Sequence, residues 1–289
     1  MFTLTDLDER PELASAVTGL FAAFGPGSHH QVCGIPERMG LRPVAADLKR
    51  VLGTMVLLRA QRLAGALALC RYSDQQATLW GPVVADGFSA LDLSRRLVSE
   101  ARTHLRRTGF TSLRAQVDSR NRPQKTLLQS LGFQLWKQNL LYERTLATTD
   151  ATSGAEVRLA VTADHSALTR ILTEGFPDSD HCRSDLTRRE MDEGYRHYVL
   201  SEGTAGIVAA AAVLDEPGRA WLKLVAVRRD QRGRHLARRL VEGVLAREAA
   251  RRTRAIGLEV LGDNLPAITV YLQCGFTRSM TAQILTGAV

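Results

Sequence analysis

The segment Leu222–Leu240 (LKLVAVRRDQRGRHLARRL) has the composition of an anion-binding turn. An apolar, strand-like run leads into a basic turn, and a helical pattern follows. The basic residues of the turn are Arg228, Arg229, Arg232 and Arg234. The first turn of a helix presents unpaired backbone N–H groups and the positive end of the helix dipole, and Gly233 allows the backbone to approach a ligand closely. The segment therefore suits a pyrophosphate; the alternative is a basic turn that is only solvated.

The same segment resembles the acyl-CoA signature of the GNAT N-acetyltransferase superfamily, whose turn reads Arg/Gln-x-x-Gly-x-Gly/Ala. The matching residues are Arg232, His235 and Ala237. Downstream, Leu258–Phe276 (LEVLGDNLPAITVYLQCGF) resembles the rest of the signature, in the same order and at a family-like separation. The resemblance covers nearly all of residues 156–289 and, more weakly, residues 1–144. It implies that acetyl-CoA is the acyl donor and an amine the acceptor.

The sequence departs from this signature at His235, which occupies the position of the central glycine. A histidine there still offers its backbone N–H to a phosphate if it adopts a helical conformation. We therefore expect CoA binding that is weaker or differently shaped, rather than lost. We interpret the histidine as a tolerated substitution, and a role for its imidazole is the alternative.

Acetyl transfer to an amine requires a neutral amine, a hydrogen-bond donor for the thioester carbonyl and a proton for the leaving thiolate. By resemblance, Tyr271 is the general acid, because the matching tyrosine of the family points at the CoA sulfur. Glu259 is the candidate general base, acting directly or through water, since it interrupts an apolar strand and some family members use a glutamate there. The alternatives are a core tyrosine and a glutamate that faces solvent or an arginine.

The resemblance also implies where the rest of the cofactor binds. The strand residues Val225, Ala226 and Val227 would offer backbone groups to the pantetheine arm, because in the family this strand splays from its neighbour and pairs with that arm. Asn264 resembles an asparagine that contacts the cofactor arm, with a plain turn role as the alternative. The pyrophosphate would lie on Arg232, Gly233, Arg234, His235, Leu236 and Ala237.

The chain repeats itself at an offset of 143 residues, without gaps over about forty residues. Residues 95–98 (RRLV) match residues 238–241, Asn121 falls on Asn264, and Gly132 falls on Gly275. We therefore predict one GNAT-like domain at residues 1–146, a small and polar linker at 147–155 and a second domain at 156–289.

The first copy has lost the chemistry of the second. Residues 232–235 fall on the sequence SALD at residues 89–92, Tyr271 falls on Leu128, and Glu259 falls on Gln116. We predict a degenerate first domain that packs against the second domain or shapes its acceptor site.

Strands and helices alternate in both halves, which predicts an α/β fold with a mixed sheet in each domain. The helices expected are Glu12–Phe24, Leu91–Arg107, Ser166–Gly175 and Leu236–Arg252. The main strands expected in the first half are Thr54–Arg59, Ala64–Arg71, Ala77–Val84 and Ser112–Val117, and in the second half His197–Ser201, Ala205–Leu214, Ala220–Val227 and Ala255–Leu261. A last strand, Leu135–Arg144 or Met280–Leu285, would complete the sheet of its own half.

The net charge of +8 is unevenly distributed, with 34 of the 38 basic residues being arginine. Residues 151–217 carry 6 basic and 12 acidic groups, whereas residues 218–289 carry 13 and 5. The positive part holds the proposed phosphate turn, and we hypothesise that the acidic part guides a cationic amine, with a solvated helix face as the alternative. The acids concerned are Glu174, Asp178, Asp180, Asp185, Glu190, Asp192 and Glu193.

The composition excludes several classes of protein. With 45% hydrophobic and 24% charged residues the chain is globular, and no window approaches the ~18 apolar residues of a membrane span. The acidic N-terminus lacks a signal core and the four cysteines are scattered, so we expect a reduced, cytosolic protein. No metal site is predicted, because His29 and His30 have no other ligand at suitable spacing.

The sequence thus predicts a tandem GNAT-like acetyltransferase that acts on a small-molecule or peptide amine. The tandem arrangement with one inactive half also resembles mycothiol synthases, which makes a thiol-precursor amine a further candidate. The competing class is a non-catalytic CoA-binding or interaction module on the same fold. A nucleic-acid binder is disfavoured, because only 6% of the residues are aromatic and none lies between Arg228 and Arg254.

Overall fold

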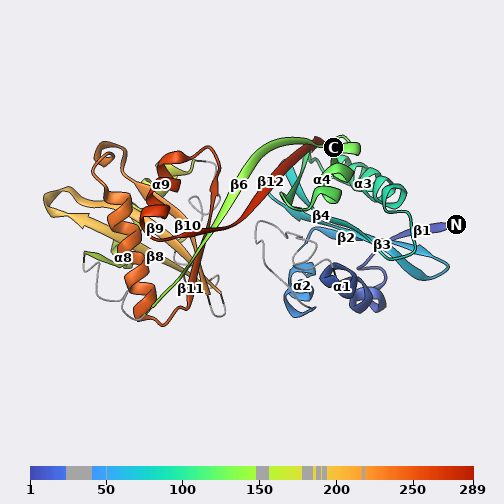
Figure 1. The fold of residues 1–289 in the computed structure, drawn as a ribbon, viewed down its shortest axis with the longest axis horizontal. Coiled ribbons are helices and arrows are strands. Elements are labelled where there is room, and N and C mark those ends of the chain that lie inside the picture. The colour runs from blue at the N-terminus through green and yellow to red at the C-terminus, as the bar shows by residue number, and fades with distance from the viewer. Residues whose placement is uncertain are drawn as a thin grey trace. The chain divides into compact units, whose positions relative to one another are not determined.

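The computed structural model describes residues 1–23, 41–49, 51–147, 156–177, 185–186, 190, 194–216 and 219–289 (Figure 1). They form two compact units. Unit 1 comprises Met1–Gln138 and Thr281–Val289, and unit 2 comprises Asn139–Met280. Nearly all of the predicted linker, and both His29 and His30, lie outside the described residues.

Unit 1 is a mixed sheet with helices on both faces. Its strand order is β1-β2-β3-β4-β5-β12, and β4 pairs with β5 in parallel. The strands are β1 (Phe2–Asp6), β2 (Gly53–Arg59), β3 (Arg62–Arg71), β4 (Gln76–Val84) and β5 (Ser112–Asp118). The helices α3 (Ala90–Arg107) and α4 (Arg122–Ser130) cover one face, and α1 (Ala14–Ala23) and α2 (Leu41–Leu48) cover the other (Figure 1).

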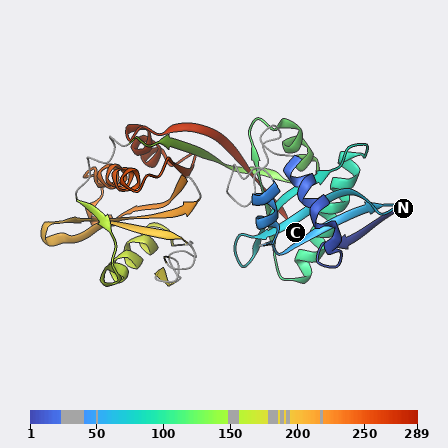
Figure 2. The ribbon, with the colours of Figure 1, turned by 90° about the horizontal axis from the view of Figure 1, so that it is seen from below.

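Unit 2 repeats this architecture, with the strand order β12-β6-β11-β10-β9-β8-β7. Its strands are β7 (Val157–Leu159), β8 (Tyr195–Glu202), β9 (Gly206–Glu216), β10 (Arg219–Val227) and β11 (Ala255–Leu261). The helices α8 (Leu236–Ala250) and α9 (Leu265–Gln273) pack on one face, and α5 (His165–Gly175) packs on the other (Figure 2). Side chains of β8 alternate between these faces: Tyr198 and Leu200 join the core under α8, and Val199 joins the core under α5.

The expectation that each half keeps its own last strand is wrong, because the two last strands are exchanged. β6 (Gln134–Thr145) passes from unit 1 into unit 2, where Asn139–Thr145 pairs antiparallel with β11. β12 (Thr277–Ala288) passes from unit 2 into unit 1, where Ala282–Ala288 pairs antiparallel with β5. Each strand carries a short apolar run, Leu140–Tyr142 in β6 and Ile284–Leu285 in β12, so the sequence pattern fits either sheet.

The other predicted elements lie within a few residues of their predicted bounds, whereas α2 was not predicted; the predicted α/β fold is confirmed. Gly132 and Gly275 end α4 and α9 in the left-handed conformation, with φ values of 85° and 77°, as expected of helix C-terminal glycines. In the described part of the chain, no helix is long and apolar enough to cross a membrane.

Candidate functional site

Unit 2 contains a pocket of about 580 Å³ at the end of β10, where the N-termini of α8 and α9 and the C-terminus of α5 also contribute walls. Nine of the predicted cofactor-binding residues line this pocket: Val225, Ala226, Val227, Arg232, Gly233, His235, Leu236, Ala237 and Asn264. Tyr271 lines it too, whereas Glu259 and Arg234 are not among its lining residues. The structure thus gathers residues from distant parts of the sequence into one cavity.

One edge of β10 leaves its sheet pairing beside this pocket. The parallel pairing with β11 covers only Ala220–Leu222, whereas pairing with β9 continues to Val227. A register shift of β10 against β9 lies between Leu222 and Leu224, and such a bulge bends a strand away from its neighbour. Backbone groups of residues 225–227 on the β11 side are therefore left without a strand partner, as the splayed strand of the prediction requires.

The N-terminus of α8 is open toward the pocket. Its N-cap residue, His235, makes no side-chain capping hydrogen bond. The first N–H groups of the helix can therefore donate hydrogen bonds to a ligand. Gly233 has a φ of 81°, and a side chain there would meet no atom within 4 Å. The conformation and the open space both suit the close approach of an anion.

His235 itself adopts the left-handed conformation, with φ 57° and ψ 16°. This explains the glycine of the family signature, because a left-handed residue with a Cβ costs roughly 1–2 kcal/mol. The backbone N–H remains at the helix entrance, and the imidazole belongs to the pocket wall.

Replacing His235 with glycine is expected to raise the free energy of unfolding by about 0.5–1 kcal/mol, since relief of the left-handed strain exceeds the added entropy of the unfolded chain. Urea denaturation measures this change. His235→Ala is the matched control, because it removes the imidazole but retains the strain. Equal stabilisation by both substitutions would contradict the backbone explanation.

The arginines of the turn do not all face the pocket. Arg228 pairs with Asp230 at 2.7 Å and Arg234 pairs with Glu202 at 2.8 Å. Arg232 lines the pocket, and its Nε donates to the Val227 carbonyl oxygen at 3.2 Å. Within the described part of the chain Arg232 has no carboxylate partner, so its charge is free to meet a phosphate.

Tyr271 is both a core residue and a pocket residue. Its side chain is only 8% exposed, and its ring packs edge-on against Phe276 with centroids 5.9 Å apart. Burial, together with the nearby Cys274 thiol, raises the pKa of Tyr271 to about 12. The hydroxyl therefore stays protonated at working pH and can serve as a hydrogen-bond or proton donor.

The buried Cys274 thiol is expected to make unit 2 sensitive to alkali. Burial, aided by the Glu242 carboxylate, raises the pKa of Cys274 to about 11. The unfolded thiol titrates near ~8.5, so this contribution to stability is complete below pH ~8.5 and is lost as pH rises toward 11. Between pH 7.5 and 10, Cys274→Ala should lose about 1–2 kcal/mol less unfolding free energy than the wild type. Urea titrations at both pH values test this; identical losses would contradict it.

Glu259 lies on β11, where its carboxylate accepts a hydrogen bond from the Asn139 side-chain amide of β6. Asn139 is 8% exposed, so the pair belongs to the sheet interior near the exchanged strand. Glu259 is not among the residues that line the pocket, and its role as a base stays a prediction.

Asn264 caps helix α9 by accepting a hydrogen bond from the Ala267 N–H at 3.3 Å. Its counterpart Asn121 caps α4 in the same way, on the Gln124 N–H at 3.1 Å. The turn role therefore exists in both units, whereas only Asn264 also lines the pocket.

The acidic acceptor surface is only partly described. Asp178, Asp180, Asp192 and Glu193 lie outside the described residues. Glu190 contacts two histidines, with 2.7 Å to His197 Nδ1 and 3.3 Å to His165 Nε2. Neither Glu190, Glu174 nor Asp185 is a pocket residue.

Sequence reasoning missed several walls of the pocket. The missed residues are Gly175, Phe176, Gln231, Arg238, Pro266, Ala267, Val270 and Gln273. Those on α9 recur at helical spacing around Tyr271, which is the signal that could have found them. Gly175 lacked any such signal: a Cβ there would lie 3.0 Å from the Ala226 Cβ, so glycine lets α5 end against β10.

In unit 1, side chains occupy both the helix N-terminus and the splayed strand edge that are open in unit 2. Ser89 caps α3 by accepting from the Asp92 N–H at 3.4 Å and donates to the Asp92 carboxylate at 2.7 Å, so the helix entrance binds its own side chains. At the splay of β4 from β5, the Gln124 side-chain amide donates to the Gly81 carbonyl oxygen at 3.4 Å. The counterpart of Gln124 in unit 2 is Ala267, which leaves the corresponding space free.

Known proteins share this architecture. Residues 165–276 match the model of the acetyltransferase (GNAT) family. A GCN5-related N-acetyltransferase from Sphaerobacter thermophilus superposes with a TM-score of 0.75 at 18% identity, covering 99% of this chain and 95% of that one. A tandem GNAT protein from the clavulanic acid biosynthesis pathway gives 0.71 at 17% identity, with 100% and 98% covered. A GNAT-family acetyltransferase from Colwellia psychrerythraea gives 0.62 at 14% identity, with 99% of both chains covered. No curated protein matches the sequence.

Proposed function

Because residues 165–276 form a domain of the GNAT acetyltransferase family and the whole chain has the tandem GNAT fold, we propose that unit 2 transfers an acetyl group from acetyl-CoA to a primary amine. The observation that carries this proposal is the pocket itself. It combines an uncapped helix N-terminus, an unpaired strand edge and a protonated tyrosine in one cavity. These are an anion site, a site for an extended amide-bearing arm and a proton donor.

In the proposed complex the pyrophosphate of CoA lies on the N–H groups of residues 233–237, with Arg232 as its counterion. The pantetheine arm pairs with the free edge of β10 as an added strand. A backbone N–H of residues 225–227 donates to the thioester carbonyl and stabilises the negative charge that develops on its oxygen.

The reaction proceeds by direct attack of the neutral amine on the thioester carbon. The new C–N bond forms as the tetrahedral intermediate appears, and its collapse breaks the C–S bond. Tyr271 gives its proton to the departing thiolate, and the proton that the attacking nitrogen loses as it becomes the amide returns to Tyr271 through solvent, so the protons balance. We infer that Glu259 acts only indirectly, through water, because it lies outside the pocket lining.

For the acceptor we propose a cationic amine of a small molecule or a peptide, attracted by the acidic segment that includes Glu174 and Asp185. The degenerate unit 1 is proposed to serve the fold rather than to bind CoA. Its phosphate position carries Asp92, which would repel a phosphate.

The test is release of free thiol from acetyl-CoA in the presence of a panel of amines, with calorimetric titration of CoA alongside. Amine-dependent thiol release supports the transferase. CoA binding without turnover on any amine would instead support a non-catalytic CoA-binding module. No CoA binding at all would refute both functions.

A further inference from the structure

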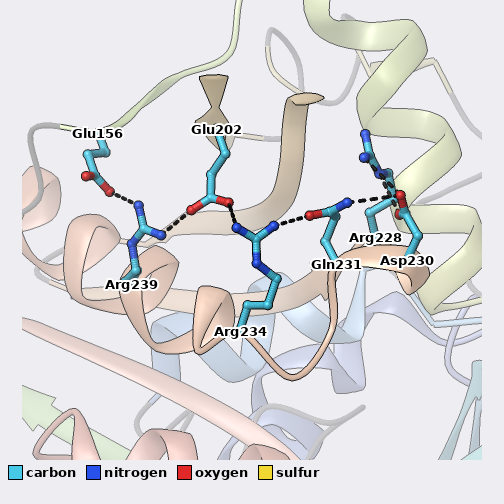
Figure 3. Close-up of polar contacts among 7 residues, drawn as sticks. All are labelled: Glu156, Glu202, Arg228, Asp230, Gln231, Arg234 and Arg239. Carbon is cyan, nitrogen blue, oxygen red and sulfur yellow. Dashed lines mark hydrogen bonds and ion pairs between the residues drawn. The ribbon is translucent and has the colours of Figure 1, made fainter. Parts of the chain in front are cut away.

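A chain of ion pairs outside the pocket connects the phosphate turn to the end of β8 (Figure 3). Glu202, the last residue of β8, lies at its centre and contacts two arginines on either side of the start of α8. Its carboxylate pairs with Arg234 at 2.8 Å and also with Arg239. A single side chain from another element thus holds both the turn and the first part of the helix.

The contacts continue in both directions from these two arginines. Arg239 also pairs with Glu156, and Arg234 donates a hydrogen bond to the Gln231 side-chain oxygen. Gln231 in turn donates to Asp230 at 3.1 Å. The turn is therefore held by side-chain contacts of which only Gln231 belongs to a residue that lines the pocket.

The backbone of this turn needs such support. Gly233 and His235, on either side of Arg234, both have positive φ values, 81° and 57°. When residues with positive and negative φ alternate, successive backbone N–H groups point toward the same position and form an anion-binding concavity. It is also a sparsely populated conformation for a histidine, and such conformations persist only when the surroundings hold them.

The negative charge of Glu202 is unfavourable beside a site that is proposed to bind phosphate. A carboxylate near a phosphate site weakens phosphate binding through like-charge repulsion. Glu202 is mostly shielded from solvent, with 18% of its side chain exposed, and it is neutralised by two guanidinium groups. Its presence is therefore explained by the geometry that it imposes.

Unit 1 provides an internal comparison. At the offset of 143 residues, Glu202 falls on Arg59 at the end of β2, and Arg234 falls on Leu91. This connection is thus missing from the unit whose helix entrance is closed by its own serine cap.

We propose that Glu202 is a positioning residue that holds residues 232–237 in their phosphate-binding shape through Arg234 and Arg239. This inference rests on the proposed function of the pocket, yet its first consequence is independent of any ligand. Without Glu202, the turn should sample other conformations even in the free protein.

The ligand-free test is amide hydrogen exchange of residues 232–238 in the full-length protein. Glu202→Gln should accelerate exchange there at least about fivefold, and Glu202→Asp should restore part of the protection. Glu242→Gln is the matched control, because Glu242 pairs with Arg238 within α8 at 2.7 Å, and among the described residues this ion pair joins no second element. Equal exchange in Glu202→Gln and wild type would overturn the proposal.

The ligand-bound test is titration with CoA. Loss of a positioning contact raises the Kd for CoA, whereas loss of a repelling negative charge lowers it. We expect Glu202→Gln to raise the Kd for CoA about three- to tenfold and to raise the acetyl-CoA KM equally, with kcat within twofold of wild type. Glu242→Gln should leave the Kd unchanged or lower it, since it removes a negative charge and releases Arg238, which lines the pocket. Tighter binding by Glu202→Gln would mean that Glu202 withholds Arg234 from the phosphates, and would overturn the proposal.

The two failures can be told apart. If the wild type does not bind CoA, the proposed function fails, and the exchange experiment still decides whether Glu202 orders the turn. If the wild type binds CoA and Glu202→Gln binds equally well, the inference alone fails. Thermal unfolding of each variant excludes a general loss of structure as the cause.

Discussion

Tyr271→Phe is expected to lower kcat about 100-fold while changing the Kd for CoA less than twofold. General acid catalysis typically contributes 10²–10⁴-fold, and the departing thiolate loses its donor in this variant. The phenyl ring retains the edge-on contact with Phe276 and the wall of the pocket. The substitution should therefore lower kcat without weakening CoA binding. Steady-state kinetics with the best amine of the panel measure kcat, and CoA titration measures the Kd.

The pH dependence adds a second criterion for Tyr271. Because the pKa of Tyr271 is raised to about 12, its proton is present throughout the usual assay range. The wild-type kcat should therefore show no fall due to Tyr271 below pH ~11. A loss of kcat with a midpoint near 9 would have to come from another group.

Glu259→Gln is the matched control for Tyr271→Phe. Glu259 is bonded to Asn139 and lies outside the pocket lining, so we expect its neutralisation to reduce kcat less than tenfold. If Glu259→Gln abolished turnover while Tyr271→Phe retained it, the assignment of roles would be reversed. Full turnover in Tyr271→Phe would remove Tyr271 from the mechanism but would leave the CoA pocket intact.

Periodic patterns predicted the elements of this fold well because they report burial on a sheet face or a helix stripe. They could not predict the exchange of β6 and β12. The last strand of each half needs only an apolar run and backbone pairing, and the sheet of each unit offers a strand, β5 or β11, that can pair with it. Which copy pairs with β5 or β11 depends on the path of the chain rather than on local sequence.

The parts of the site that could be predicted are those whose backbone conformation requires particular residue types, such as glycine. Gly233 and the basic turn marked the helix entrance, whereas the left-handed conformation of His235 was indicated only by the glycine that the resembling family signature has at this position. Nor could charge counts separate Arg232, which faces the pocket, from Arg234, which pairs with Glu202. The carboxylate partner of Arg234 lies on β8, about thirty residues earlier in the chain, so only the tertiary structure distinguishes the two arginines.

Glu248→Gln is expected to lower the free energy of unfolding of unit 2 by about 3–5 kcal/mol. Glu248 is fully buried on α8 and accepts hydrogen bonds from Arg196 at 2.7 and 3.0 Å, from the Tyr198 hydroxyl at 2.6 Å and from Thr253 at 2.8 Å. Removing its charge leaves the Arg196 guanidinium, whose side chain is 10% exposed, with the more exposed Asp215 as its one remaining counterion among the described residues. The glutamine amide also turns an N–H group toward donors.

The comparison that isolates this effect is between Glu248→Gln and Glu242→Gln, which remove the same charge from the same helix. The Arg238–Glu242 pair is exposed and lies at i,i+4 spacing, so its loss should cost less than about 0.5 kcal/mol. A double variant, Arg196→Met with Glu248→Leu, should recover most of the loss, because an apolar pair leaves no buried charge uncompensated. Urea denaturation of the three variants decides the matter. If the double variant were no more stable than Glu248→Gln, the cost would lie in the packing of α8 against β8 and not in the stranded arginine.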